Sequence, residues 1–350
     1  MTLLTTTIGA YPKPDYVPTP DWFRAESLSI PDPTKAYEQF CRTQVDDVEA
    51  LLVRGTHEVV LDQVNAGIDV PTDGEVRREN YIHYHCRHLD GIDFSRLSHK
   101  VMRAGTWEGE VPTVVGPIKA REYFLPHDYR IAQSATDRPV KITIPGPLTI
   151  TDSTADAYYG DEKRLGAALA DAINTEIRAL VEAGCTWIQI DEPVFAREPE
   201  KALAFGIGNL ERCFHGVPAH VVRVTHMCCG YPDKVDNEDY PKADPVAYFQ
   251  LADAIETSSI DAVSIEDAHR HNDLTLLEHF PTTKIILGVV AIARTRVEPM
   301  EEIAGRLTEA LNHIDADRLI AAPDCGLGML DRATVLAKLT NMVTATRSIR

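Results

Sequence analysis

Short runs of β-branched and other apolar residues alternate with longer amphipathic stretches along nearly the whole chain. We place strands at Leu4–Ile8, Ile68–Thr72, Lys141–Ile144, Trp187–Ile190, Ala219–Val224, Ala262–Ile265, Lys284–Gly288 and Arg318–Ala321. Helices with apolar residues at steps of three and four are expected at Pro33–Ala66, Lys163–Ala183, Pro245–Ser258, Pro299–Ile314 and Arg332–Ser348. This alternation is typical of βαβ units and predicts an α/β fold, a (β/α)8 TIM barrel, with an open doubly wound sheet as the alternative.

Two stretches do not follow this repeat. Tyr11–Asp32 contains five prolines, so we expect an irregular N-terminal extension that covers one end of the barrel as a lid. Residues 91–138 alternate apolar and polar side chains, which predicts an antiparallel insertion between strands two and three. Neither stretch resembles a separate domain, so residues 1–350 are expected to form a single domain with the insertion inside it.

Composition excludes several classes of partner. The 53 acidic and 35 basic residues give a formal net charge of −18, a field that repels nucleic-acid phosphates and anionic lipid. There is no apolar run long enough to span a membrane, and no glycine-rich nucleotide-binding motif. The seven cysteines are odd in number and widely spaced, which favours a reducing, cytoplasmic location over a disulfide framework.

Four residues with soft or borderline ligand atoms follow successive predicted strands: His226, Cys228, Glu266 and Cys325. Each one alone is better explained as an ordinary core or loop residue, because free cysteine is among the most buried residue types. As a set they are more informative, since a barrel brings its strand ends to one rim. Two cysteines, one histidine and one carboxylate suit tetrahedral Zn²⁺, so the sequence predicts a zinc site there.

Carboxylates follow two other predicted strands. Glu75 lies in an Asp-Gly-Glu segment after strand two, and Asp191 and Glu192 follow strand four. A carboxylate at such a rim can bind a substrate ammonium group, although a helix cap or a buried ion pair explains each of them equally well. The nearby histidines His83, His85 and His88 are expected to be surface or packing residues.

The order of short motifs along the chain resembles that of a known family. The motifs Ile8-Gly9, Asp73-Gly74-Glu75, Gly146-Pro147-Leu148-Thr149, Gln189-Ile190-Asp191-Glu192-Pro193, His226-Met227-Cys228, Ile265-Glu266 and Pro323-Asp324-Cys325-Gly326-Leu327 occur in the order seen in the catalytic barrel of cobalamin-independent methionine synthase. The resemblance runs nearly end to end and lacks the duplicated N-terminal half of the long members. The chain is therefore similar to the short, single-barrel members.

The resemblance implies roles for individual residues. The zinc ligands would be His226, Cys228, Glu266 and Cys325. Asp191 would hold the amino group of homocysteine with help from Glu75, and the backbone of Ile8 and Gly9 would contact its carboxylate. Ala10 stands where the family has a serine, so one hydroxyl contact is missing. The implied reaction is zinc-dependent methyl transfer to homocysteine through a zinc-bound thiolate, forming methionine.

Two departures from the family bear on the methyl donor. The segment Ala291–Arg294 lacks the acid expected to protonate a departing pteridine nitrogen, and Ser153 stands near the place of a tryptophan that stacks on the pterin. Methyl-tetrahydrofolate is therefore less favoured than a methylcobalamin-type or other donor, supplied as a small molecule or by a partner protein. Three alternatives stay open: alkyl transfer to another thiol, such as from an epoxide, a metal-free decarboxylase-like barrel, and a non-catalytic binding module.

Overall fold

A curled parallel β-sheet forms the centre of the molecule. The computed structural model describes residues 3–21, 33–43, 47–237 and 239–349. Seven strands hydrogen-bond in the order β1-β10-β9-β8-β7-β6-β4. Their bounds are β1 Leu4–Thr5, β4 Lys141–Pro145, β6 Trp187–Asp191, β7 Val222–Met227, β8 Ala262–Ile265, β9 Lys284–Val290 and β10 Leu319–Pro323. All six pairings are parallel, so every strand presents its carboxyl end at the same rim.

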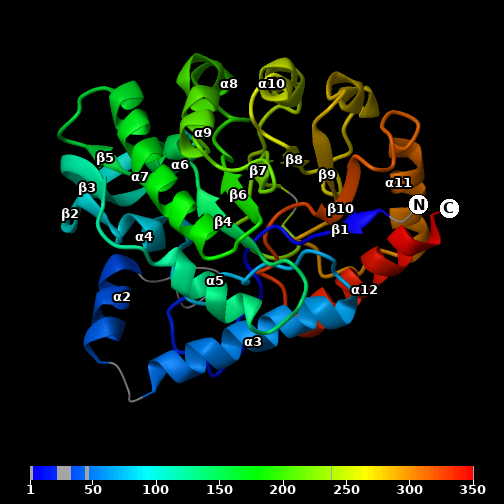
Figure 1. Ribbon diagram of the computed structural model, residues 1–350, viewed down its shortest axis with the longest axis horizontal. Coiled ribbons are helices and arrows are strands. Elements are labelled where there is room, and N and C mark those ends of the chain that lie inside the picture. The colour runs from blue at the N-terminus through cyan, green and yellow to red at the C-terminus, as the bar shows by residue number, and fades with distance from the viewer. Residues whose placement is uncertain (1–2, 22–32, 44–46, 238, 350) are drawn as a thin grey trace.

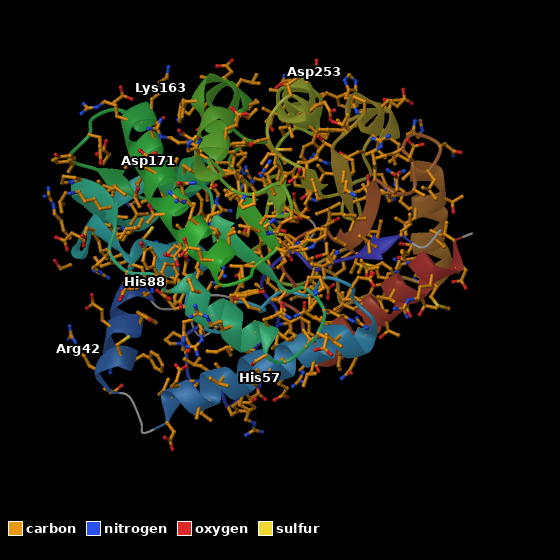
Figure 2. The ribbon with its side chains drawn as sticks, in the orientation of Figure 1. Arg42, His57, His88, Lys163, Asp171 and Asp253 are labelled. Carbon is orange, nitrogen blue, oxygen red and sulfur yellow. The ribbon has the colours of Figure 1, made fainter. Side chains whose placement is uncertain are left out.

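Helices cover the outer face of the curled sheet (Figure 1). They are α2 Pro33–Arg42, α3 Val48–Ala66, α4 Tyr81–Cys86, α5 Leu125–Gln133, α6 Pro147–Asp152, α7 Glu162–Glu182, α8 Pro199–Lys201, α9 Ile207–Cys213, α10 Val246–Glu256, α11 Met300–Ala310 and α12 Arg332–Ser348, with a π-helical turn at Ala202–Gly206 and a 3₁₀ helix at Leu274–His279. Their polar faces are turned to solvent, as Lys163 and Asp253 illustrate (Figure 2). In the described residues no helix combines the length and apolar character needed to cross a membrane.

The antiparallel insertion is a long hairpin. Strands β2 (Leu89–Met102) and β3 (Trp107–Ala120) pair antiparallel, and the short β5 (Ala155–Asp156) adds to β3. The predicted extent of the insertion, 91–138, is partly wrong, because α5 occupies its last third. Pro126 in the first turn favours that helix, and Leu125, Tyr129 and Ala132 are buried at helical spacing.

Three other predicted elements differ from the structure. The predicted strand Ile68–Thr72 is reduced to isolated bridges at Val70 and Thr72, because Pro71 has no N–H to donate to a ladder. The strand predicted at Ala219–Val224 begins instead at Val222, after a turn in which the Val221 N–H donates to the Pro218 carbonyl. The helix predicted at Pro33–Ala66 is two helices. Asp47, just before α3, has a left-handed φ of 74°, which a continuous helix does not allow.

Two apolar regions lie on the two faces of the sheet. The larger one packs the helices against the strands. The smaller one consists of Ile8, Val224, Ala262, Ile286, Ile320 and Ala322, with Trp187 and Val222 against it. Because side chains alternate along a strand, Val224 shares its face of β7 with His226. The smaller cluster therefore lies inside the curl and forms the floor beneath the rim where the candidate site lies.

The described part of the N-terminal extension, residues 11–21, contains no helix or strand, as its prolines predict. Tyr11 is buried, and its N–H donates to the carbonyl of Gly74. Residues 22–32 lie outside the described residues, so the lid stays a prediction.

Candidate active site

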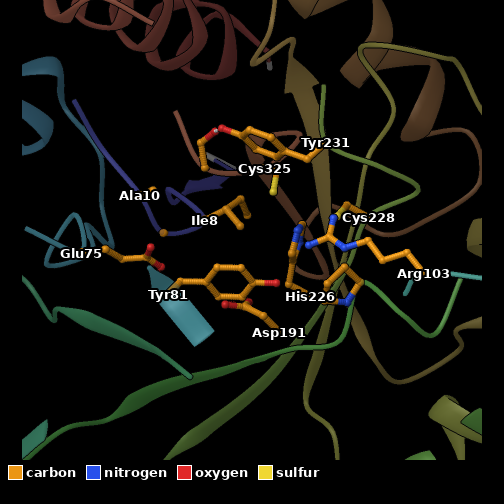
Figure 3. Close-up of a pocket in the computed structure, with 13 residues that line it drawn as sticks. Ile8, Ala10, Glu75, Tyr81, Arg103, Asp191, His226, Cys228, Tyr231 and Cys325 are labelled. Atoms are coloured by element: carbon orange, nitrogen blue, oxygen red, sulfur yellow. Dashed lines mark hydrogen bonds between the residues drawn. The ribbon is translucent and has the colours of Figure 1, made fainter. Parts of the chain in front are cut away.

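A cavity at the carboxyl-end rim collects most of the residues singled out in the sequence. Its volume is about 60 Å³. It is lined by Ile8, Gly9, Ala10, Glu75, Tyr81, Arg103, Asp191, Pro193, His226, Cys228, Tyr231, Cys325 and Gly326 (Figure 3). Seven of the eight predicted site residues are in this set, and only Glu266 is not. Residues of β6 and β7 and of the segments after β1 and β10 meet here because these strands end at one rim.

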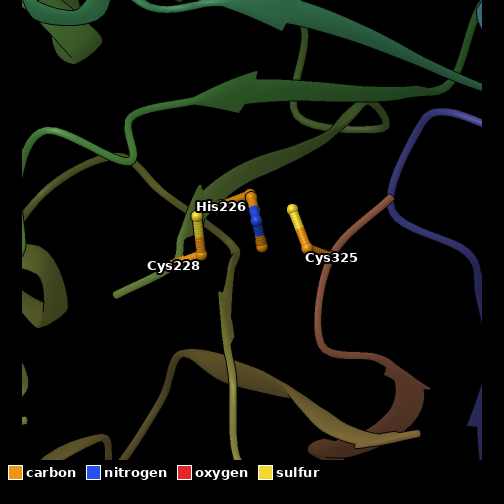
Figure 4. A group of neighbouring side chains, drawn as sticks. All are labelled: His226, Cys228 and Cys325. Carbon is orange, nitrogen blue, oxygen red and sulfur yellow. The ribbon is translucent and has the colours of Figure 1, made fainter. Parts of the chain in front are cut away.

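Three of the four predicted metal ligands form a close group. One ligand atom each from His226, Cys228 and Cys325 lies within 4.8 Å of the others (Figure 4). His226 is fully inside the protein, and its Nδ1 lies 2.9 Å from Ser264 Oγ. Its Nε2 is buried with no hydrogen-bond partner among the described residues. A buried nitrogen without a partner is costly unless something binds it, so the donor set and the geometry both fit a metal ion.

The two cysteines of this group are electrostatically different. The Cys325 thiol and then the His226 imidazole hold the pKa of Cys228 well below its usual value, against the effect of burial. The neighbouring Cys228 sulfur raises the pKa of Cys325 well above its usual value. The two thiols thus shift each other's pKa in opposite directions, which favours loss of the proton from Cys228 before Cys325. A cation placed between them favours the thiolate form of both.

Glu266, the fourth predicted ligand, lies just beyond the end of β8. It is buried, its Oε2 accepts a hydrogen bond from the Cys229 N–H at 3.2 Å, and its Oε1 is 3.5 Å from Lys242 Nζ. Its carboxylate is thus engaged by the residue that follows Cys228, at the edge of the three-residue group. Asp324 supports the loop that begins at Glu266. The Asp324 carboxylate accepts hydrogen bonds from the N–H groups of residues 267–269 at 2.7–2.9 Å.

Asp191 lies beside the metal group, because Asp191 of β6 pairs with His226 of β7 (Figure 3). Gln189 Nε2 donates to Asp191 Oδ1 and to the Ile8 carbonyl, both at 2.7 Å, and so ties β6 to the chain after β1. Burial raises the pKa of Asp191 to about 7, although the nearby His226 lowers it. A buried carboxylate with one weak neutral donor is suited to accept a cationic group from a ligand.

Glu75 is held in a strained backbone conformation. Its φ of 57° lies in the left-handed region, which is uncommon for a residue other than glycine. Thr143 Oγ1 donates to Glu75 Oε1 at 2.9 Å, and the Arg78 guanidinium lies 3.4 Å from the same oxygen. Burial raises the pKa of Glu75. An added Cβ at Gly9 would come within 2.7 Å of this carboxylate, so only glycine allows the close approach.

Glu192, next to Asp191, has a structural role. Its carboxylate accepts hydrogen bonds from the Leu148 and Thr149 N–H groups and from Thr149 Oγ1, at 2.7–3.0 Å, at the start of α6. Burial raises its pKa to about 8. The histidines His83 and His85 are buried on α4 and do not line the cavity, as expected of packing residues.

The sequence reasoning missed several cavity residues. Tyr81 begins α4, Tyr231 follows β7 and donates to the Gly326 carbonyl at 2.9 Å, and Arg103 comes from the tip of the β2–β3 hairpin. Arg103 reaches the cavity from a segment more than a hundred residues away from Cys228 in the chain. Its only local signal is the Ala-Gly turn that follows it, which does not predict where the tip lies.

Comparison with known proteins identifies the relatives of this fold and site. The model of the cobalamin-independent synthase catalytic domain matches residues 3–348. The chain belongs to the cobalamin-independent methionine synthase family. It is 34% identical to the methionine synthase of Saccharolobus solfataricus, over 99% of this chain and 95% of that protein. The recognised motifs thus belong to a resemblance that covers almost the whole chain.

Solved structures agree with this assignment. The B12-independent methionine synthase of Shewanella sp. W3-18-1, in complex with selenomethionine, aligns with a TM-score of 0.86 and 27% identity, covering 99% of this chain and 98% of that one. A putative vitamin-B12-independent methionine synthase from Listeria monocytogenes aligns with a TM-score of 0.70 and 20% identity, covering 99% and 98% of the two chains. The second likeness supports the fold alone.

Proposed function

We propose that this protein is a zinc-dependent methyltransferase that forms methionine from homocysteine. The observation that carries the proposal is the meeting, in one buried cavity, of the His226-Cys228-Cys325 group and the carboxylate of Asp191. The first suits a thiol-activating metal and the second suits an amino group. The family relationship and the names of the relatives support this combination.

The proposed metal ligands are His226, Cys228, Cys325 and Glu266. Zinc held there would lower the pKa of an incoming thiol, so that the substrate sulfur attacks as a thiolate. Glu266 would exchange its contacts with the Cys229 N–H and Lys242 for the metal. As the hardest donor of the four, it is the ligand expected to loosen when a substrate sulfur enters.

The chain's own residues orient the amino acid. Asp191 accepts the ammonium group, Glu75 assists, and the Ile8-Gly9 backbone contacts the carboxylate. Gln189 fixes the spacing between Asp191 and the Ile8 backbone, because its amide nitrogen donates to the Ile8 carbonyl and to the Asp191 carboxylate. In the reaction a new S–CH₃ bond forms as the bond from the methyl carbon to the donor breaks, and the donor keeps that electron pair.

We also infer that the curled sheet closes into an eight-unit barrel within one catalytic domain. The segment around Pro71 lies between the two edge strands: Val70 bridges to Thr6 after β1, and Thr72 bridges to Lys141 of β4, both in parallel. The Val70 N–H donates to the Thr5 carbonyl at 3.0 Å, and the Lys141 N–H donates to the Pro71 carbonyl at 2.8 Å. The eighth strand would thus be present in position, with its ladder interrupted by proline.

A donor screen tests the proposal. Zinc-loaded protein is incubated with homocysteine and, separately, methyl-tetrahydrofolate, methylcobalamin, a methyl sulfonium and an epoxide, and the thioether is measured by mass spectrometry. We expect methionine from a donor with a better leaving group than the folate nitrogen, and loss of product with a chelator. Formation of thioether from the epoxide alone would favour the epoxide-to-thiol alternative, and no thioether from any donor would contradict the proposal.

A further inference from the structure

A second, larger cavity adjoins the candidate active site on its outer side. Its volume is about 310 Å³, and it shares Arg103 and Tyr231 with the inner cavity. Arg197, Trp107 and Tyr240 also line it. Arg103 and Tyr231 therefore separate the outer chamber from the inner cavity, which Cys228 lines and in which Arg103 extends toward Cys228 (Figure 3).

Two guanidinium groups face this outer chamber without an anionic partner. Among the residues that the structure describes, neither Arg103 nor Arg197 lies within ion-pair distance of a carboxylate. Arg197 donates only to neutral oxygens, Thr106 Oγ1 at 3.2 Å and the Pro241 carbonyl at 2.8 Å. Burial and the neighbouring Arg103 lower the pKa of Arg197. Cys228, Cys229 and Glu266 act on Arg197 only at longer range. Two neighbouring arginines without a carboxylate at ion-pair distance are unusual in a chain with a net charge of −18.

Other arginines in the same protein show the ordinary arrangement. Arg78 lies 3.3 Å from Asp73, Arg306 binds Asp267, and Arg332 binds Asp62. Two exposed carboxylates, Asp233 and Asp239, also line the chamber. Asp233 accepts a hydrogen bond from Asn237 at 2.7 Å, and among the described residues neither carboxylate forms an ion pair with Arg103 or Arg197. These two guanidinium groups, which have no carboxylate partner, are therefore a local exception, and they line a chamber that adjoins the candidate active site.

The hairpin tip that carries Arg103 is firmly anchored. Arg103, Ala104 and Gly105 have left-handed φ values of 53°, 54° and 85°. The Arg103 N–H donates to Asp152 Oδ2 at 3.0 Å, and Lys100 Nζ donates to the Thr151 and Thr154 carbonyls, both at 2.8 Å. These bonds attach the tip to α6 and the residues just after it. The cation is thus pre-positioned, which lowers the entropy cost of binding an anion.

Two aromatic residues complete the outer chamber. Trp107 is 55% exposed, and the Arg103 guanidinium lies 5.9 Å from its ring centre. The Tyr240 hydroxyl is buried and has no hydrogen-bond partner among the described residues. An exposed ring and an unsatisfied hydroxyl next to two guanidinium groups suit a ligand with a flat or apolar part and an oxyanion.

We propose that the outer chamber binds an anionic oxygen group, a carboxylate or a phosphate, on the methyl donor, and that Arg103 and Arg197 recognise it. This inference rests on the proposed function, because it assigns the outer chamber to the donor of that reaction. The Tyr240 hydroxyl is the third polar contact, and Trp107 covers the adjoining part of the ligand. The two arginines would make the enzyme select donors by charge.

The test is a binding titration on zinc-loaded protein with inorganic phosphate and, in a separate arm, glutarate, read by calorimetry and by tryptophan fluorescence. We expect saturable binding of one probe, and the arm that binds more tightly identifies the anion. Arg103→Gln and Arg197→Gln should each weaken it about tenfold, the loss expected for one charge-assisted hydrogen bond. The matched control is Arg164→Gln, an exposed arginine 5.9 Å from the Tyr159 ring centre.

The outcomes separate this inference from the proposed function. Zinc content and homocysteine binding are measured on the same samples. Zinc content should stay unchanged in all three variants, and homocysteine binding should stay unchanged in Arg197→Gln and Arg164→Gln, which do not line the inner cavity. No saturable binding of either probe, equal affinity in wild type and the two chamber variants, or an equal loss in Arg164→Gln would each overturn the anion site while leaving the zinc-thiol chemistry intact. Loss of zinc or homocysteine binding in the wild type would instead contradict the proposed function.

Discussion

Two buried lysines show how differently the inside of the curled sheet and its outer helical layer treat charge. Lys338, on α12, is fully buried, and its Nζ donates to both oxygens of Glu298 at 2.9 and 2.7 Å and to the Arg296 carbonyl at 2.6 Å. Lys141, on β4, is equally buried, but its Nζ has no hydrogen-bond partner among the described residues. The buried cation of the outer layer is fully paired, whereas the buried cation inside the curl is not.

The unsatisfied groups of the interior lie on the path to the candidate site. Lys141 shares its face of β4 with Thr143, which holds Glu75, and Gln189 Oε1 and His226 Nε2 are also buried without partners. Such groups lower the free energy of unfolding unless a ligand or a metal binds them. The contrast indicates that stability is concentrated in the helical layer and reactivity inside the curl.

The largest expected effect is on the metal group. Cys228→Ser should reduce zinc content to less than about a tenth of one ion per chain and activity by roughly a thousandfold, because a hydroxyl is a much weaker zinc ligand than a thiolate. Metal analysis and the methionine assay measure both effects. The matched control is Cys229→Ser, which changes the next residue, outside the metal group. Stoichiometric zinc in Cys228→Ser would contradict the ligand assignment.

The outer layer should respond strongly in stability alone. Lys338→Met leaves Glu298 buried without its cation, and breaking such a pair costs about 3–5 kcal/mol of unfolding free energy. Urea unfolding measures this loss. Zinc content of the folded fraction should not change, because neither residue belongs to the metal group or lines the cavity. A variant as stable as the wild type would remove the contrast between the two regions.

Lys141→Met should change the free energy of unfolding in the opposite direction and stabilise the protein. Burial lowers the pKa of Lys141 from 10.5 to about 7, so the folded state disfavours its proton. Its contribution to the free energy of unfolding is therefore most favourable above pH 10.5, where the lysine is neutral in both states. That contribution is lost as the pH falls from 10.5 through 7. The variant lacks this loss, so it should be more stable than the wild type by on the order of 2 kcal/mol at pH 6, with the difference shrinking toward pH 10.

The measurement is urea unfolding of both proteins across that pH range, and Lys163→Met on the exposed start of α7 is the control. If Lys141→Met were less stable than the wild type at pH 6, the Lys141 ammonium group would have to be stabilised in the folded wild type. The contrast with the paired Lys338 would then fail.

The smallest expected effect is on substrate capture. Asp191→Asn keeps the size of the side chain and its ability to form hydrogen bonds, but removes its charge. Homocysteine binding should therefore weaken about tenfold, as expected for the loss of one charge-assisted contact. Calorimetric titration with homocysteine measures this change, and zinc content should match the wild type. Unchanged affinity would show that the amino group is held elsewhere.

Much of the site could be predicted because its residues follow strands. A buried apolar run ending in a chemically active residue marks both the strand and the rim position, as in Ile190-Asp191 and Thr225-His226. Parallel pairing then brings such residues together whatever their separation in the chain. The prediction of β8 at Ala262–Ile265 matched the structure for the same reason, since the run is continuous and uninterrupted.

The missed features depend on contacts that no local pattern encodes. Pro71 reduces the predicted second strand to two bridges, although its neighbours Val70 and Thr72 keep the expected positions. Arg103 reaches the site only because the hairpin tip is tied to Asp152 and to the loop after α6. Glu266 followed its strand as predicted, yet its carboxylate engages the Cys229 N–H and Lys242, which depends on how the loops after β7 and β8 pack.

Zinc K-edge X-ray absorption on protein loaded with one equivalent of zinc, with and without homocysteine, tests the central claim most directly. The account predicts two sulfur neighbours at about 2.3 Å together with nitrogen and oxygen neighbours at about 2.0–2.2 Å, and a third sulfur when homocysteine is added. A shell of nitrogen and oxygen alone, or a spectrum unchanged by homocysteine, would contradict it.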